Sequence, residues 1–138
     1  TFKPKIIGVS CPFIVRLQQC FDFCNLVKKI DPNILVVMGG SSCSALKTEI
    51  FERCQDIDVI DLVEGEEVFH ELVQRYLQGE NFDNIPSIAY RKNGKIFHGE
   101  LVPAIVESID LLPEPDFELL AMERYFNQRS ENLGSLLP

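Results

Sequence analysis

An uninterrupted apolar run over residues 34–38 constrains the fold of this chain more than any other feature. A strand that is apolar at every position has both faces covered, which is typical of parallel sheets packed between helices. The run follows Asp31-Pro32-Asn33, which ends a preceding helix, and it stops at Gly39-Gly40. It therefore predicts a buried strand of an α/β layered sheet.

Strands and helices are predicted to alternate on either side of this run. Apolar runs at 5–10 and 59–63 predict two further strands. Apolar residues recur at steps of three and four over 13–30, which indicates a helix. Residues 46–54, with Ser44 as a possible N-cap, and residues 64–78 predict two more helices. Connections of this length give parallel strands with right-handed crossovers.

The character of the chain changes after the third predicted helix. Asn93-Gly94 lies between two β-rich runs and predicts a β-hairpin over 86–98. Beyond residue 102, prolines interrupt a segment without regular periodicity, so 103–138 is predicted to be a connector with one amphipathic helix at 117–126. The predicted fold is α/β, a Rossmann-like (flavodoxin-like) parallel sheet with flanking helices over 1–102, plus the C-terminal hairpin and an extended linker.

Composition narrows the classes of partner and compartment. The formal net charge of −8 repels phosphate backbones, so nucleic acid is not expected as a partner. No apolar run approaches the roughly 18 residues that a membrane span needs, so no membrane partner is expected. The five cysteines are an odd number in apolar surroundings, which predicts reduced thiols in a cytoplasmic protein.

Three strand-to-helix turns are rich in glycine or small polar residues. The first turn follows the strand that ends at Ser10. The second contains Gly39-Gly40 with Ser41 and Ser42, and the third contains Glu64-Gly65-Glu66. Ligands of open α/β sheets bind at the carboxyl ends of the strands, where glycine lets a ligand approach the backbone. Each turn alone is explained by tight local geometry, but three on one edge favour a ligand groove.

An ordered set of motifs makes a family resemblance specific. The motifs lie at 6–10, 31–42, 63–67, 85–96 and 109–120. In this order they resemble the cobalamin-binding domain at the front of class B radical S-adenosylmethionine enzymes. The chain departs from the family pattern at Pro12, Ser42, Val63 and Ser87, where the family often has Leu, His, Gly and Gly.

The resemblance implies a cofactor site and a larger protein. Ser10, Gly39 and Gly40 would line the pocket for the dimethylbenzimidazole nucleotide tail of cobalamin. The residues that would border it are Ser41, Ser42, Glu64, Gly65 and Glu66. The partner would be a radical S-adenosylmethionine barrel of the same parent chain, which would hold a 4Fe-4S cluster and S-adenosylmethionine. The parent would be a methyltransferase or resemble the anaerobic Mg-protoporphyrin monomethyl ester cyclase.

The resemblance also implies that this chain is a non-catalytic piece of that protein. The family's first two strands, which can carry the lower histidine ligand of cobalt, are expected to be missing. The piece is therefore expected to bind cobalamin weakly or not at all. The strand at 5–10 would lie at an exposed sheet edge, and an open apolar edge predicts dimerisation or strand exchange.

Other candidate chemistry finds a simpler explanation. His70 and His98 are predicted to be surface or packing residues, and no catalytic residue or metal ligand is assigned. Cys20 and Cys24 lie on the apolar stripe of a helix and are predicted to be core residues, whereas Cys43 is predicted to be the most accessible thiol. The alternatives are an interaction or scaffold domain that no longer binds cobalamin, a small enzyme, and a flavodoxin- or receiver-like module.

Overall fold

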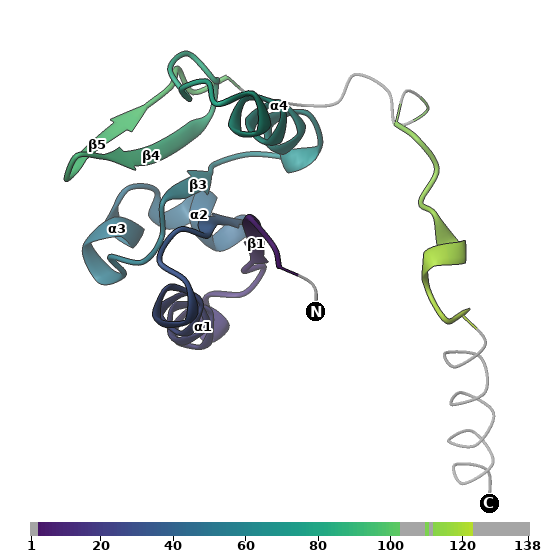
Figure 1. Cartoon of the computed structure of the whole chain (residues 1–138), viewed down its shortest axis with the longest axis horizontal. Coiled ribbons are helices and arrows are strands. Elements are labelled where there is room, and N and C mark those ends of the chain that lie inside the picture. Colours follow the sequence, from purple (N-terminus) through teal and green to yellow (C-terminus); the bar gives the residue numbers. More distant parts are fainter. Residues whose placement is uncertain (1–2, 103–109, 111, 123–138) are drawn as a thin grey trace, which may run out of the picture. The chain divides into compact units, whose positions relative to one another are not determined.

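The computed structural model describes residues 3–102, 110 and 112–122. The chain divides into two compact units, 1–105 and 106–138, which are considered separately. The first unit carries the sheet and its helices (Figure 1). Its elements are β1 (Ile6–Ser10), η1 (Ile14–Arg16), α1 (Leu17–Ile30), β2 (Leu35–Gly39), α2 (Ser41–Leu46), α3 (Glu49–Arg53), β3 (Val59–Asp61), α4 (Gly65–Gln78), β4 (Ile88–Lys92) and β5 (Lys95–His98).

The five strands form one sheet in the order β1-β2-β3-β4-β5. The first three are parallel, with Gly8 opposite Val37 and Val37 opposite Val59, so the predicted α/β fold is confirmed. The predicted hairpin is also present, with Asn93 and Gly94 at φ 52° and 74° in its turn. It is more than an appendage, because β4 pairs antiparallel with β3 and extends the sheet.

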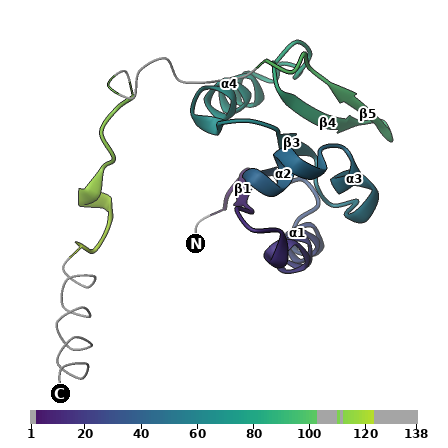
Figure 2. The same cartoon turned by 180° about the vertical axis from the view of Figure 1, so that it is seen from behind.

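Each face of the sheet has its own core. On one face, residues such as Met38 and Ile60 pack with α1, α2 and α3. On the other face, Val37 and Val59 pack with Leu72 of α4. Both views of the ribbon show the sheet between α1 and α4 (Figures 1 and 2). This arrangement explains why β2 is apolar throughout, since its successive side chains enter different cores.

The region between β2 and β3 differs from the prediction. A single helix over 46–54 capped by Ser44 is wrong, because two short helices, α2 and α3, meet at Lys47, whose φ is 49°. Gly40, at φ 96° and ψ 172°, turns the chain directly from β2 into α2, so helix formation begins at Ser41. The helix predicted over 13–30 begins as the 3-10 turn η1 and becomes α-helical at Leu17.

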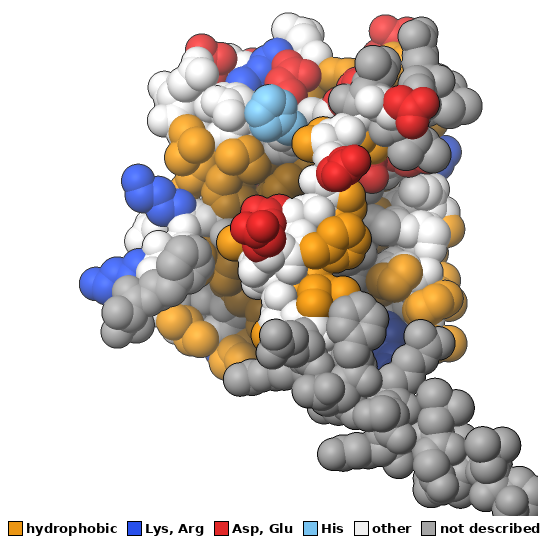
Figure 3. Space-filling model, turned by 90° about the vertical axis from the view of Figure 1, so that its right-hand side faces the viewer, with side chains coloured by type: hydrophobic (Ala, Val, Ile, Leu, Met, Phe, Trp, Pro, Cys, Tyr) orange, Lys and Arg blue, Asp and Glu red, His pale blue; other side chains and the backbone are white. Residues whose placement is uncertain are grey.

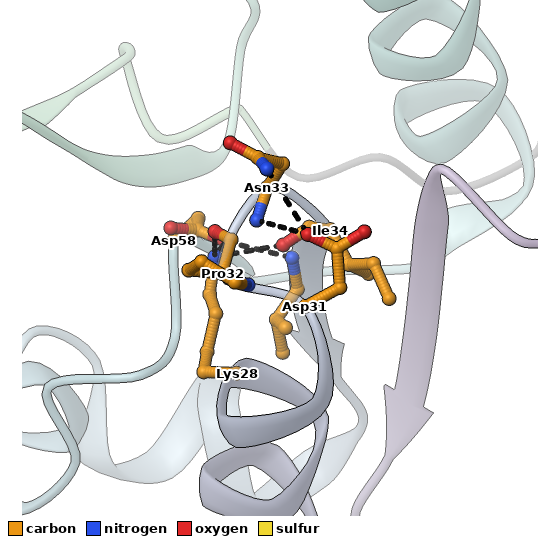
Figure 4. Close-up of polar contacts among 7 residues, drawn as sticks. Lys28, Asp31, Pro32, Asn33, Ile34 and Asp58 are labelled. Atoms are coloured by element: carbon orange, nitrogen blue, oxygen red, sulfur yellow. Dashed lines mark hydrogen bonds and ion pairs between the residues drawn. The ribbon is translucent and has the colours of Figure 1, made fainter.

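A polar cluster at the amino ends of the parallel strands joins α1, β2 and the loop before β3 (Figure 4). Lys28 Nζ lies 2.6 Å from Asp58 Oδ2 and donates to Ile34 O at 2.7 Å. Asp58 Oδ2 also accepts a hydrogen bond from Val36 N at 2.7 Å. These contacts tie the end of α1 to the start of β2 and to the loop before β3. They fix the relative positions of the strands whose far ends carry the glycine turns.

The second unit is described only at 110 and 112–122. It contains the 3-10 turn η3 (Phe117–Leu119), where Asp116 Oδ1 accepts a hydrogen bond from Glu118 N at 3.0 Å. The helix predicted at 117–126 is therefore a 3-10 turn at its start, and residues 123–126 lie outside the described part. Most of the predicted connector 103–138 also lies outside it. Among the described residues, no helix is both long and apolar enough to cross a membrane.

Candidate functional site

An open groove of about 810 Å³ lies between β1 and α4, at the carboxyl ends of the parallel strands. This volume is within the range of about 300–1,000 Å³ that is typical of small-molecule and cofactor pockets. Figure 3 shows the recessed hydrophobic surface, with a histidine and acidic side chains near its border. The residues that line it are Gly8, Val9, Ser10, Val37, Gly39, Gly40, Asp61, Val63, Glu64, Gly65, Glu66, Phe69, His70 and Val73.

The floor of the groove is built from strand positions that face α4. Gly8 and Ser10 of β1 lie opposite Val37 and Gly39 of β2. Because side chains alternate along a strand, these positions share the face that carries Val37 in the α4 core. A Cβ at Gly8 would lie 3.6 Å from Cζ of Phe69, so the missing side chain leaves the space beside that ring open. The groove is therefore deep at Gly8, directly beside the aromatic ring of Phe69.

Asp61, the last residue of β3, is a buried carboxyl in this groove. Its side chain lies on the α4 face, and the residue is only 6% exposed. Oδ1 accepts a hydrogen bond from Val63 N at 3.1 Å. Burial raises the pKa of Asp61, as does the negative charge of Glu66, and the backbone N–H groups of Val63 and Leu62 offset only part of this rise.

Two glycines keep this carboxyl open to the groove. A Cβ at Gly65 would lie 2.8 Å from Asp61 Oδ2, and one at Gly39 would lie 3.7 Å from Asp61 Cβ. Any side chain at Gly65 would meet the carboxyl oxygen directly. Because Gly39 and Gly65 have no side chains, a ligand in the groove can approach the carboxyl group of Asp61.

The rim of the groove is acidic and includes the start of α4. Glu66 and Glu67 lie in the first turn of this helix, where the helix dipole stabilises carboxylates. Exposed His70 is one turn further on, with its Nε2 3.4 Å from Nε2 of Gln74. His98 lies exposed on β5, as the sequence predicts for a surface residue.

The residues that line the groove are suited to hydrogen bonds and apolar contacts with a ligand. Among the described residues, no group of three or more His, Cys, Asp or Glu side chains is arranged to hold a metal ion. The lining combines glycines and apolar side chains with one buried carboxyl. Such a surface suits a flat aromatic group that also carries polar atoms.

Comparison with known proteins identifies the family. The sequence model of the B12 binding domain matches residues 1–73, about half of the chain. The chain belongs to the B12 binding domain family. The match spans β1 to the middle of α4, which are the elements that form the groove.

Curated relatives of this B12 binding domain are longer proteins. An uncharacterized methyltransferase of Pyrococcus horikoshii is 29% identical over 90% of the chain, which spans 27% of that protein. The anaerobic magnesium-protoporphyrin IX monomethyl ester cyclase of Rubrivivax gelatinosus is 29% identical over 91% of the chain, which spans 23% of it. The cobalamin-dependent radical SAM methyltransferase TokK of Streptomyces tokunonensis is 27% identical over 82%, and the chain spans 16% of it.

Solved structures share the fold. The radical S-adenosylmethionine methyltransferase TsrM from Kitasatospora setae, with cobalamin and a [4Fe-4S] cluster bound, superposes with a TM-score of 0.63 at 18% identity, covering 83% of this chain and 21% of TsrM. The cobalamin-dependent enzyme OxsB, with aqua-cobalamin bound, gives a TM-score of 0.58 at 21% identity over 72% of this chain and 14% of OxsB.

The structure brings together most of the site residues predicted for this B12 binding domain. Those in the groove are Ser10, Gly39, Gly40, Glu64, Gly65 and Glu66. Ser41 and Ser42 are outside the groove lining. Ser41 Oγ donates to Pro12 O at 2.5 Å, and Ser42 is buried, with its Oγ 3.5 Å from Sγ of Cys11. Their separation follows from α2, which begins at Ser41 and packs on the other face of the sheet.

Sequence reasoning missed the wall of the groove and its buried acid. Phe69 and Val73 are four residues apart on α4, which is the spacing of one helical face. Asp61 is two residues after the buried Val59, so strand alternation could have placed it on the same face. Both signals were present in the sequence, but none of these three residues belongs to a glycine turn.

The cysteines are core residues, with one correction. The prediction that Cys43 is the most accessible thiol is wrong, since it is fully buried while Cys20 is partly exposed. Cys43 follows the start of α2 by two residues and points into the α1 core. Burial raises the pKa of Cys43 and Cys24 to about 12 and that of Cys20 to about 11, so all three remain thiols at neutral pH.

Proposed function

We propose that the groove between β1 and α4 holds the nucleotide tail of cobalamin. The family match, the relatives that carry cobalamin, and the shape of the groove support this proposal. The observation that carries it is the juxtaposition of Gly8 and Gly39 on the floor with Phe69 on the wall. A flat base needs a low floor and an apolar wall at the same place.

The residues present fit the tail of this cofactor. A side chain at Gly8 or Gly39 would occupy the space above the floor, and Phe69 and Val73 provide apolar contact area. Ser10 and the turn at Gly65 supply polar groups at the mouth. When bound, cobalamin supplies a cobalt centre for group transfer, and the residues described here bind and orient its tail.

The wider function follows from the longer relatives. We place this module beside a radical S-adenosylmethionine barrel in the same polypeptide, which would hold the 4Fe-4S cluster and S-adenosylmethionine. The reaction class would be methyl transfer or a cyclase-like reaction, as the names of the relatives suggest. The barrel would supply catalysis, and this domain would supply the cofactor. The five free thiols support a reducing, cytoplasmic location.

Filling the groove tests the proposal. Gly8→Val places a β-branched side chain beside Phe69 on a strand that accommodates it. We expect at least a tenfold loss of cobalamin affinity in equilibrium dialysis, because a filled floor excludes the base. The matched control is Lys92→Val, which creates the same residue at an exposed strand position at the end of β4.

The outcomes separate cofactor binding from a scaffold role. A loss of cobalamin affinity in Gly8→Val, with unchanged affinity in Lys92→Val, supports the groove as the binding site. Equal affinity in both variants would place the cofactor elsewhere. We expect weak but measurable binding by this chain, so absence of binding in the unsubstituted chain at millimolar cobalamin would favour a scaffold domain.

A further inference from the structure

The geometry points to Asp61 as a selectivity residue: we infer that the groove prefers a cobamide whose nucleotide base is a purine such as adenine over one that carries dimethylbenzimidazole. This inference rests on the proposed function, because it assumes that a cobamide tail enters the groove. It goes further by stating which nucleotide base of the cobamide the groove prefers. It is carried by the position of one carboxyl and of the two glycines beside it.

The carboxyl lies where the edge of a base would meet it. Asp61 comes from β3, the strand next to Gly39, and it lines the same groove as Phe69. Oδ1 is held by Val63 N at 3.1 Å, which fixes the orientation of the carboxyl group. Oδ2 lies beside Gly65, which has no side chain to stand between this oxygen and the groove. A base that slides along Phe69 toward the sheet would therefore reach Oδ2.

The environment makes the charged form of this acid less favourable than it is in water. Asp61 is 6% exposed, and burial together with the nearby Glu66 raises its pKa. A neutral carboxyl presents an O–H donor and a C=O acceptor, whereas a carboxylate only accepts. Oδ2 accepts a hydrogen bond in either form, so the groove offers an acceptor within a mostly apolar lining.

The two bases differ at the edge that would face this group. Adenine carries ring nitrogens that accept hydrogen bonds and an amino group that donates. The corresponding edge of dimethylbenzimidazole carries two methyl groups, which would leave Oδ2 of Asp61 without a hydrogen-bond partner while Oδ1 keeps its bond from Val63 N. A site built around a buried polar group rejects an analogue that leaves that group unpaired. Asp61 would therefore strengthen binding of the adenine cobamide and weaken binding of the dimethylbenzimidazole cobamide.

Paired affinities test the inference. Dissociation constants of the chain for the cyano form of cobalamin and of its adenine analogue would be measured by NMR titration, which resolves weak binding. We expect the adenine cobamide to bind about tenfold more tightly. In Asp61→Val, which removes the polar group, we expect the two constants to agree within about twofold. In Asp61→Asn, which keeps a side-chain oxygen that accepts hydrogen bonds, we expect the preference to remain.

A matched control and the pattern of outcomes make the test decisive. Asp22→Asn changes an exposed carboxylate on α1, on the other face of the sheet, and should leave both constants unchanged. Equal affinity for both cobamides in the unsubstituted chain, or a preference that survives Asp61→Val, would overturn the inference and leave the proposed function intact. If neither cobamide binds, the proposed function is refuted instead.

Discussion

Replacing Gly40 with alanine should destabilise the domain strongly, because two separate costs fall on one position. Its φ of 96° and ψ of 172° lie in a region that residues with a side chain rarely adopt. A Cβ there would lie 2.9 Å from the carbonyl oxygen of Cys11 and 3.0 Å from its carbonyl carbon. Both are backbone atoms, so the neighbour has no flexible side chain that could move away.

The magnitude follows from the contacts of Cys11. Its N–H donates to Gly39 O at 2.8 Å, and its carbonyl accepts from Ser42 N at 3.2 Å. Conformational strain costs about 1–3 kcal/mol, and weakening one of these hydrogen bonds costs about 1 kcal/mol more. We therefore expect the free energy of unfolding to fall by about 2–4 kcal/mol.

Urea denaturation followed by circular dichroism measures this loss. With a slope of about 1.5 kcal/mol per molar urea, a loss of about 3 kcal/mol lowers the midpoint by about 2 M. The adjacent Gly39→Ala is the matched control, since its φ is not positive and its Cβ would make an ordinary contact at 3.7 Å. That variant should change stability by less than about 1 kcal/mol. Equal losses in the two variants would refute the reasoning.

Three further predictions address packing, ionisation and association. Leu72→Ala should lower the free energy of unfolding by about 2–5 kcal/mol in urea denaturation, because Leu72 is fully buried between α4 and the sheet. Leu77→Ala on the exposed side of the same helix should cost little, and similar losses would contradict the two-core structure. Asp61 has a raised pKa, so the folded state binds the proton more tightly and stability falls as pH rises from about 4 through the folded-state pKa. Asp61→Asn should therefore gain stability relative to the unsubstituted chain between pH 4 and 7, and parallel pH profiles would be inconsistent with a buried acid. Because β1 is an edge strand, light scattering should detect dimers at high concentration, and a monomer throughout would argue against pairing at that edge.

The main architecture could be predicted because single strands carry strong local signals. Residues 34–38 are apolar without interruption, and the structure places β2 at the centre of the three parallel strands with a core on each side. Asn93-Gly94 likewise identified the hairpin, since this pair adopts positive φ readily. The three turns at the carboxyl edge followed from the alternation of strands and helices.

The remaining details depend on contacts between distant residues. The start of α2 at Ser41 is set by the conformation of Gly40 against Cys11, which no local pattern reveals. The antiparallel pairing of β4 with β3 depends on where the chain returns after α4. The place of Asp61 in the groove required knowing which face of β3 meets α4. A single acid in an apolar strand gave too weak a signal by itself.

The most direct test of the account is an NMR titration of the ¹⁵N-labelled chain with cyanocobalamin, which is diamagnetic and leaves the spectrum sharp. If the tail occupies the groove, the largest changes in amide shift should fall on Gly8, Gly39 and Gly65 and on the α4 residues around Phe69. The amides of α1 on the opposite face should remain unchanged. Changes centred on α1, or none at millimolar cofactor, would contradict the claim that this groove is the cofactor site.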